Sequence, residues 1–250
     1  MEAKNIDNSK KYFLDKIDSI AFDGHTLYRI VALKDFSDVK TGDKGGYIES
    51  EGNLSQDGNS WVYHRAKVWN AARISDNAQV FGQAEVYDNA QVGGTSWVYG
   101  HAEVFGQAEV YGDAQVGGDS WVYDDAKVYD NAQVGGTSWI YGNAKVYGDA
   151  QVLGESYIYD NAHVYGDAQV LGESYIYDNA HVSGNAQVYD RAHISGYTQI
   201  TGDAKISGYG ELNVDDTIKE NVVLDFGRND SASESESLSV DESRRKGLSR

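Results

Sequence analysis

The sequence contains neither cysteine nor proline, and it has no long hydrophobic run. Without cysteine the chain can form no disulfide and offers no thiolate, which suits a reducing compartment, so we expect a cytoplasmic protein. No stretch approaches the roughly 18 apolar residues of a membrane-spanning helix, and the N-terminus has no apolar core of a signal peptide. The absence of proline is typical of a chain in which nearly every backbone N–H group is needed in a sheet.

Basic residues are also scarce. The 250 residues include 21 Lys and Arg against 39 Asp and Glu, which gives a formal net charge of −18 at pH 7. A nucleic-acid-binding protein needs Lys and Arg to neutralise phosphates, so this balance argues against direct nucleic-acid binding. Tyrosine, by contrast, is abundant, with 19 residues.

A repeat of six residues fills the middle of the chain. Between Ser60 and Ala204 every sixth residue is small, with 18 Ala, six Ser and one Thr. Val or Ile follows two residues after each of these 25 positions, and Gly, Asp, Asn or His follows four residues after. Residues two apart share one face of a strand, and the fourth position suits a left-handed corner. Glycine at this frequency would cost roughly 1 kcal/mol per residue in a helix, so the repeat predicts short strands joined by corners.

Three hexads make one coil of the predicted structure. Residue i then lies directly under residue i+18, one strand spacing or about 4.8 Å away. The segment GESYIYDNAHV accordingly occurs twice, at 154–164 and again one coil later at 172–182. The hexads predict a little over eight coils, a three-sided prism roughly 40 Å long with a thin core of small and aliphatic residues.

Runs such as NAQVYDRAHISG at 185–196 resemble the hexapeptide-repeat superfamily. The resemblance implies a left-handed parallel β-helix and trimeric assembly, and the superfamily includes acyltransferases and γ-type carbonic anhydrases. The usual enzyme pattern places glycine directly after the aliphatic residue, whereas here it comes one residue later. The NA-x-VYG style is similar to uncharacterised phage and bacterial proteins described as putative transferases or polymer-forming proteins. We therefore expect an all-β chain, a left-handed parallel β-helix of about 18 residues per coil with a small N-terminal β-rich cap.

The two ends of the chain differ from the repeat. Residues 1–53 lack the hexad, and Asp23-Gly24 between two apolar runs predicts a hairpin. We expect this segment to cap the open end of the solenoid, where the first coil would otherwise expose unpaired edges. The β-helix is expected over 54–225. The segment 226–250 is rich in serine and charge and has little to bury, so we expect it to be a disordered tail.

Residues one coil apart form columns, so the outer faces of the prism can be read from the sequence. The first face has a mid-strand column that includes His163 and His181, next to a column of tyrosines: Tyr111, Tyr129, Tyr147 and Tyr165. The second face has a glutamine ladder from Gln115 to Gln187, next to a smooth strip of Gly117, Gly135, Leu153 and Leu171. The third face has two aromatic columns: Trp121, Trp139, Tyr157 and Tyr175, flanked by Trp69, Tyr87, Phe105, Tyr123, Tyr141, Tyr159 and Tyr177.

The aromatic third face has two interpretations. Stacked rings stabilise a sheet by ladder packing without any further role. Eleven rings on one flat face, however, exceed the apolar patch of a few hundred Å² that a monomer normally exposes, and Tyr and Trp dominate binding hot spots. We therefore predict that these eleven residues bind a protein partner. Packing of the third face on the second face of a neighbour is a head-to-tail contact that closes at three subunits, so we also expect a homo-oligomer, with a trimer favoured.

His163 and His181 are weak candidates for a metal site. A zinc site needs three or four ligands, and only these two histidines align. In the enzymes that the repeat resembles, histidines at subunit clefts bind zinc or act as general bases. Here the repeat is uninterrupted from 60 to 208, so no loop is available to build a cleft for a substrate. We expect no metal, no cofactor and no catalytic residue.

Acidic residues dominate the repeat, with a net charge of −12 over residues 55–210. Four of them share one corner column: Asp88, Asp124, Asp160 and Asp178. This charge either keeps the solenoid soluble or imitates DNA, although duplex DNA carries about twice that charge over the same length. The predicted function is a non-catalytic scaffold or protein-binding module encoded by a phage or other mobile element. The alternatives are an acidic nucleic-acid mimic that inhibits a host defence protein, and a hexapeptide-type acyltransferase.

Overall fold

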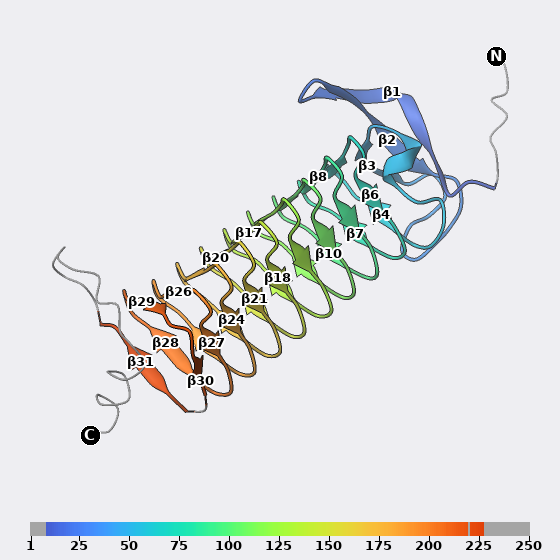
Figure 1. Ribbon diagram of the computed structural model, residues 1–250. Coiled ribbons are helices and arrows are strands. Elements are labelled where there is room, and N and C mark those ends of the chain that lie inside the picture. The colour runs from blue at the N-terminus through green and yellow to red at the C-terminus, as the bar shows by residue number, and fades with distance from the viewer. Residues whose placement is uncertain (1–8, 220, 228–250) are drawn as a thin grey trace, which may run out of the picture.

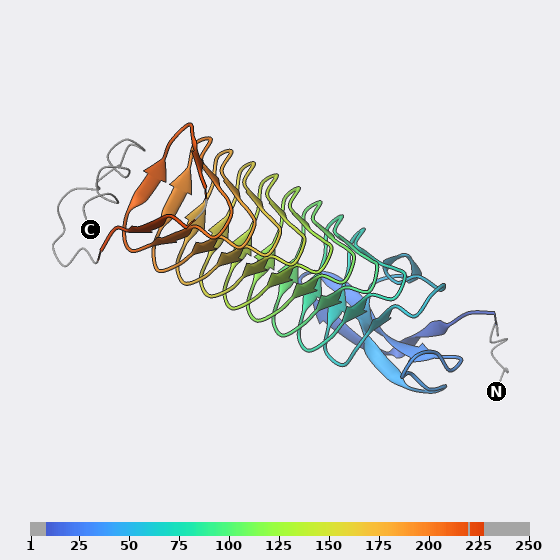
Figure 2. The same ribbon diagram turned by 90° about the horizontal axis from the view of Figure 1, so that it is seen from below.

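The computed structural model describes residues 9–219 and 221–227. Within them the chain is a solenoid of short strands along one long axis, with an N-terminal hairpin at one end (Figure 1). The view from below shows the same regular stack of coils (Figure 2). A single turn of 3-10 helix, η1 (Glu51–Asn53), interrupts the strands of this part of the chain. None of the described residues forms a helix with the length and apolar character needed to span a membrane.

The described strands form three sheets, one for each side of the prism. Sheet 1, the expected third face, contains in spatial order β1 (Tyr12–Phe22), β2 (His25–Ala32), β3 (Lys44–Ile48), β5 (Lys67–Val68), β8 (Glu85–Val86), β11 (Glu103–Val104), β14 (Trp121–Val122), β17 (Trp139–Ile140), β20 (Tyr157–Ile158), β23 (Tyr175–Ile176), β26 (His193–Ser195) and β29 (Glu211–Asn213).

Sheet 2, the expected second face, contains β4 (Trp61–Val62), β7 (Gln79–Val80), β10 (Trp97–Val98), β13 (Gln115–Val116), β16 (Gln133–Val134), β19 (Gln151–Val152), β22 (Gln169–Val170), β25 (Gln187–Val188), β28 (Lys205–Ser207) and β31 (Val223–Asp225). Sheet 3, the expected first face, contains β6 (Arg73–Ile74), β9 (Gln91–Val92), β12 (Glu109–Val110), β15 (Lys127–Val128), β18 (Lys145–Val146), β21 (His163–Val164), β24 (His181–Val182), β27 (Gln199–Ile200) and β30 (Thr217–Ile218).

Parallel pairing of residue i with residue i+18 holds on all three sheets. Trp121 pairs with Trp139 on sheet 1, and Gln115 pairs with Gln133 on sheet 2. Nine strands of sheet 1, from β5 to β29, and ten strands of sheet 2, from β4 to β31, follow one another in this way. The expected all-β parallel β-helix with 18-residue coils is therefore confirmed, and it is longer than the little over eight coils that the hexads alone predict. The additional strands lie at the two ends, where the hexad pattern is imperfect.

The core is a thin column of small and aliphatic side chains. Every small and every Val or Ile position of the hexads, from Ser60 to Ile206, is buried. The fourth position of each hexad turns the corner with a positive φ, from 51° at His64 to 90° at Gly208. Non-glycine corners are mostly Asp, a residue type that tolerates this backbone because its short polar side chain hydrogen-bonds locally. The prism shape thus follows from the six-residue pattern of small, aliphatic and corner residues.

The N-terminal hairpin continues sheet 1 beyond the first coil. Strands β1 and β2 pair antiparallel, and Asp23 and Gly24 form the turn with φ angles of 45° and 80°. Strand β2 pairs antiparallel with β3, and β3 in turn pairs in parallel with β5. Antiparallel strands therefore cover the edge of sheet 1 that a parallel coil would leave open. The expected disordered segment 226–250 lies outside the described residues, apart from 226 and 227.

Lys11 closes the N-terminal end of the core from the inside. Its side chain is fully buried, and its ammonium donates hydrogen bonds to the Ser60 carbonyl at 2.9 Å and the Ser60 hydroxyl at 3.2 Å. It also lies over the ring of Phe36, 5.3 Å from the centroid. Burial lowers the pKa of Lys11 to about 8. A polar side chain thus satisfies carbonyl groups of the first coil that have no preceding coil to pair with.

Candidate binding surfaces

The longer aromatic ladder follows the strands of sheet 1, one residue after each strand. Consecutive rings are 4.5–5.0 Å apart between centroids, with interplanar angles of 1–9°. The rings are those of Trp69, Tyr87, Phe105, Tyr123, Tyr141, Tyr159 and Tyr177. The centroid spacing matches the strand spacing, so the rings stack face to face along the axis and turn their edges outward.

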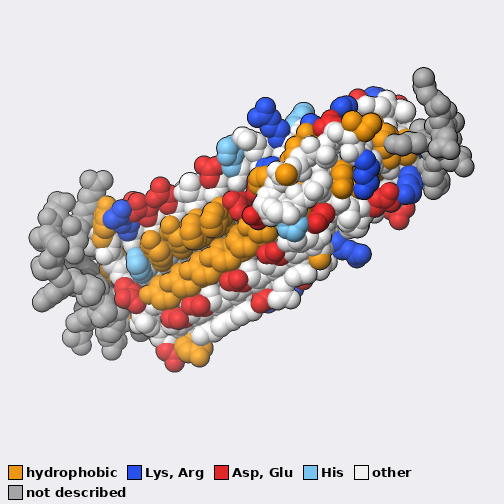
Figure 3. All heavy atoms as spheres, turned by 90° about the horizontal axis from the view of Figure 1, so that it is seen from above, with side chains coloured by type: hydrophobic (Ala, Val, Ile, Leu, Met, Phe, Trp, Pro, Cys, Tyr) orange, Lys and Arg blue, Asp and Glu red, His pale blue; other side chains and the backbone are white. Residues whose placement is uncertain are grey.

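A shorter ladder runs beside it and consists of the first residue of each of four successive strands, β14, β17, β20 and β23. Trp121 stacks on Trp139 with centroids 4.8 Å apart, and Tyr157 stacks on Tyr175 at 4.7 Å. Between these two pairs, the planes of the Trp139 and Tyr157 rings are at 50° to each other, so the stacking is irregular where the column changes from tryptophan to tyrosine. The two ladders touch edge to face, with Tyr123 6.5 Å from Trp139 between centroids. The space-filling view shows them as two parallel apolar ridges along one side of the solenoid (Figure 3).

The phenol groups of the longer ladder differ between its ends and its middle. Tyr87 donates to Glu103 at 2.9 Å, and Tyr177 donates to Glu211 at 3.2 Å. The hydroxyls of Tyr123, Tyr141 and Tyr159 have no hydrogen-bond partner among the described residues. Burial, with smaller effects of neighbouring tyrosines and aspartates, raises the pKa of these three groups, to about 12 for Tyr123. The middle of the ladder therefore presents neutral hydroxyl donors beside exposed ring edges.

The N-terminal end of the longer ladder is closed by the hairpin. Trp69 is only 2% exposed because the ring of Phe22 packs edge to face against it, with centroids 5.4 Å apart. Lys67 places its ammonium over the same Phe22 ring at 4.1 Å. Of the eleven aromatic residues expected to bind a partner, Trp69 is thus already covered by this chain, and the other ten are half-buried.

The second face is less smooth than its sequence indicates. A Cβ atom on Gly117 would lie 2.2 Å from the Tyr99 ring, so that ring already covers the glycine. Gly135 is also buried, with the Leu153 side chain close to it, so the open part of the strip is reduced to the half-buried side chains of Leu153 and Leu171. Trp97, the first residue of β10, is 45% exposed on the same sheet. Aromatic rings therefore cover the N-terminal part of this face, and leucines line its C-terminal part.

The two histidines stack as the i, i+18 spacing predicts. The His163 and His181 rings are 4.7 Å apart between centroids, at 7°. Burial lowers the pKa of both, and their mutual repulsion adds to the shift at His163. Both rings are therefore neutral near pH 7. Within the described part of the chain, no group of three or more His, Asp or Glu side chains is arranged to hold a metal ion.

The four corner aspartates have a local role. The carboxylate of Asp124 accepts a hydrogen bond from the backbone N–H of Gly142 at 3.3 Å, and Asp178 accepts one from Gly196 at 3.0 Å. Asp88 and Asp160 bind the N–H of the next corner residue in the same way, at 3.3 Å. Each corner carboxylate thus satisfies a backbone donor of the following coil. Sequence reasoning identified the column but not this contact.

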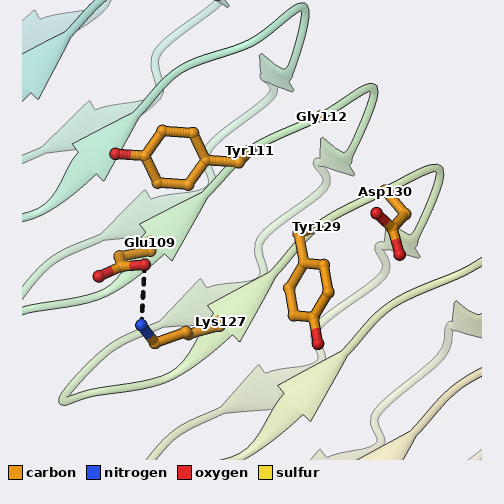
Figure 4. A pocket seen from close by; sticks show the side chains of 6 residues that line it. All are labelled: Glu109, Tyr111, Gly112, Lys127, Tyr129 and Asp130. Carbon is orange, nitrogen blue, oxygen red and sulfur yellow. Dashed lines mark hydrogen bonds and ion pairs between the residues drawn. The ribbon is translucent and has the colours of Figure 1, made fainter.

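Sequence reasoning also missed a pocket on sheet 3. Its lining residues come from two adjacent coils: Glu109, Tyr111, Gly112, Lys127, Tyr129 and Asp130 (Figure 4). The sequence signal that could have revealed it is Gly93, which lies one coil before Tyr111 in the same column. The coils after Tyr111 have a tyrosine at this position: Tyr129, Tyr147 and Tyr165. A glycine leaves room for the next ring to lean over it.

Comparison with known proteins gives one partial similarity. No family model matches the chain. A stretch of 55 residues, 22% of this chain, is 42% identical to the protein named uncharacterized acetyltransferase YdcK of Escherichia coli (strain K12). The chain spans only 17% of the length of that relative. Together with the parallel 18-residue coils, this similarity fits the hexapeptide-repeat β-helix superfamily that the sequence resembles.

Proposed function

We propose that this protein is a non-catalytic scaffold or binding module that acts through the two aromatic ladders of sheet 1. The observation that carries the proposal is their continuity, because the longer ladder stacks without a break from Trp69 to Tyr177. The rings of Tyr123, Tyr141 and Tyr159 supply apolar contact area, and their hydroxyls, which have no partner among the described residues, supply hydrogen-bond donors. Residues at binding hot spots typically provide both. The similarity of the repeat to phage-encoded sequences supports a role in a phage or other mobile element.

Ladder packing within one chain accounts for only part of this arrangement. Cross-strand aromatic pairs contribute roughly 0.2–1 kcal/mol each to a sheet. Edge-to-face contacts between the two columns, such as that of Tyr123 with Trp139, add to this packing, and the rings still remain only half-buried. Ten half-buried rings side by side form a contiguous apolar surface, which favours association.

The occupant that we propose for the ladders is a second copy of this chain. Sheet 2 offers the half-buried side chains of Leu153 and Leu171 beside Gly135, an apolar surface along the same axis. Contact between sheet 1 of one subunit and sheet 2 of the next is head-to-tail and closes as a trimer around an axis parallel to the solenoid. A further protein partner would bind the sheet 1 surface in competition with this contact.

Sedimentation velocity of matched variants tests this proposal. Trp139→Ser with Tyr157→Ser removes two rings from the shorter ladder and leaves the buried Ala and Val positions untouched. The control, Tyr147→Ser with Tyr165→Ser, removes two stacked rings from sheet 3. Because a buried Trp or Tyr contributes about 2 kcal/mol or more in a hot spot, the first variant should dissociate at concentrations at which the control remains oligomeric.

Two results would contradict the proposal. If the wild-type protein is monomeric at all concentrations, self-assembly is wrong. If both double variants have the same oligomeric state as the wild type, the contact lies elsewhere. Co-purification of a monomer with a nucleic-acid-binding protein that is released by salt would instead support the acidic-mimic function.

A second candidate function is acyl transfer. It is favoured by the similarity to a protein named as an acetyltransferase, and by the neutral state of His163 and His181, which general bases require. Titration calorimetry with acetyl-coenzyme A tests it directly. Saturable binding that is lost on His163→Gln would support this function, and an absence of binding at millimolar ligand would contradict it.

A further inference from the structure

The Tyr111 ring does not stack with the other tyrosines of its column on sheet 3. Tyr129 stacks on Tyr147 at 4.8 Å and 4°, and Tyr147 stacks on Tyr165 at 4.9 Å and 4°. The Tyr111 hydroxyl instead donates to Gln91, in the preceding coil, at 3.0 Å. Figure 4 shows the Tyr111 and Tyr129 rings pointing in different directions. The stacking position that Tyr111 vacates borders one face of Tyr129 and forms a pocket of about 320 Å³.

Gly93 is the reason for this departure. It lies one coil before Tyr111 in the same column, and a Cβ atom there would be 2.6 Å from Cε1 of Tyr111 and 2.9 Å from a carboxylate oxygen of Asp76. The absence of a side chain thus allows the Tyr111 ring to lean over the glycine backbone. Gly93 has no positive φ, so its backbone would accept another residue.

The charges around the pocket favour a cation. Glu109 and Lys127 form an ion pair at 2.9 Å, which neutralises both groups, as the dashed line in Figure 4 marks. The exposed carboxylate of Asp130 accepts the Gly148 N–H at 3.2 Å and forms no ion pair with a described residue. The lining therefore has a net charge of −1, on a chain whose net charge is −18.

We propose that this pocket binds a small, flat aromatic cation. The ligand ring stacks on the open face of Tyr129 in the position that Tyr111 vacates, and its cationic group faces the Asp130 carboxylate. Ring stacking and cation–π attraction both act at such a site. An enclosed apolar cavity of about 150 Å³ is sufficient for benzene, so the pocket has room for one ring with a charged substituent. The site is on sheet 3 and does not depend on the contact proposed for sheet 1.

Titration calorimetry with three probes of similar shape tests the ligand class. Benzamidinium is a flat cation, benzamide is its neutral analogue and benzoate is its anionic counterpart. Benzamidinium should bind the wild-type protein with one site per chain, benzamide about fivefold more weakly, and benzoate not at all. Equal affinity for the cation and the neutral amide, or no binding of benzamidinium at millimolar concentration, would overturn the proposal.

Two variants place the binding at this pocket. Gly93→Ala should displace Tyr111 into the vacated stacking position and reduce benzamidinium affinity at least tenfold, whereas Gly135→Ala, a comparable change on sheet 2, should leave it unchanged. Asp130→Asn keeps an acceptor for Gly148 and should reduce benzamidinium affinity severalfold with no effect on benzamide. An unchanged benzamidinium affinity in a folded Gly93→Ala protein, or in Asp130→Asn, would show that the ligand binds elsewhere.

Discussion

The Trp121 ring lies on the Trp139 ring with centroids 4.8 Å apart and planes at 12°, although the two residues belong to successive coils of the chain. The same offset joins their backbones, because Trp121 and Trp139 are directly paired in sheet 1. One strand spacing therefore sets both the hydrogen-bonded ladder and the aromatic ladder. A substitution at any position affects the coils before and after it in the same column.

The core should not tolerate a larger side chain at the small position. Ala126 is fully buried, and Leu there adds three heavy atoms where neighbouring coils leave room for a methyl group. Overpacking of this kind costs typically about 1–3 kcal/mol, so Ala126→Leu should lower the melting temperature by several degrees. Ala71→Leu provides a control, because Ala71 is exposed. Equal melting temperatures for Ala126→Leu and the wild type would show that the small position does not face the core.

At the corner aspartates, stability should depend on the hydrogen-bond acceptor of the side chain rather than on its charge. Asp124 has a φ of 57° and accepts the Gly142 N–H, so Asp124→Ala introduces left-handed strain and removes a hydrogen bond. We expect a loss of about 1–2 kcal/mol in the free energy of unfolding. Asp124→Asn keeps the acceptor and tolerates this backbone, so it should change stability by less than about 0.5 kcal/mol. Urea denaturation of both variants makes the comparison, and an Asn variant as unstable as the Ala variant would show that the charge is what matters.

The histidine pair should make stability depend on pH. Because the folded pKa values of His163 and His181 lie below the unfolded value, the unfolded state binds protons more readily. The resulting stability is fully present above about pH 6.5 and is lost as the pH falls through the folded pKa values. Gln91 and Gln199 occupy the same column, so His163→Gln with His181→Gln fits the fold. Relative to this variant, the wild-type protein should therefore lose unfolding free energy as the pH is lowered from 7 to 5. A constant difference would rule out this linkage.

Strict periodicity explains why so much of the fold could be predicted. Because residue i always lies under residue i+18 in the repeat, spacing in the sequence becomes position in space. The buried Ala and Val, the Asp23-Gly24 turn and the stacking of His163 on His181 all follow from spacing and residue type. The eleven aromatic residues likewise lie in two columns on one sheet, as their numbering requires.

Side-chain direction could not be predicted from spacing, because it depends on the volume of the residue in the adjacent coil. Tyr111 leans over Gly93, and Tyr99 covers Gly117, in columns where other rings stack upright. Lys11 lies outside the repeat, so no periodic argument places its ammonium against Ser60. The side-chain directions at these positions could not be predicted because a glycine or the end of the repeat interrupts the regular column there.

The most direct test of the proposed function is hydroxyl-radical footprinting as the protein concentration is raised. The middle tyrosines of the sheet 1 ladder, Tyr123, Tyr141 and Tyr159, should become protected as the protein assembles. The ladder of sheet 3, Tyr129, Tyr147 and Tyr165, stacks in the same geometry and provides an internal control that should remain equally reactive throughout. Protection of sheet 1 alone is the result that we predict. Assembly through the aromatic face would be contradicted if the reactivity of neither ladder changed with concentration. Protection of the sheet 3 tyrosines instead of the sheet 1 tyrosines would contradict it as well.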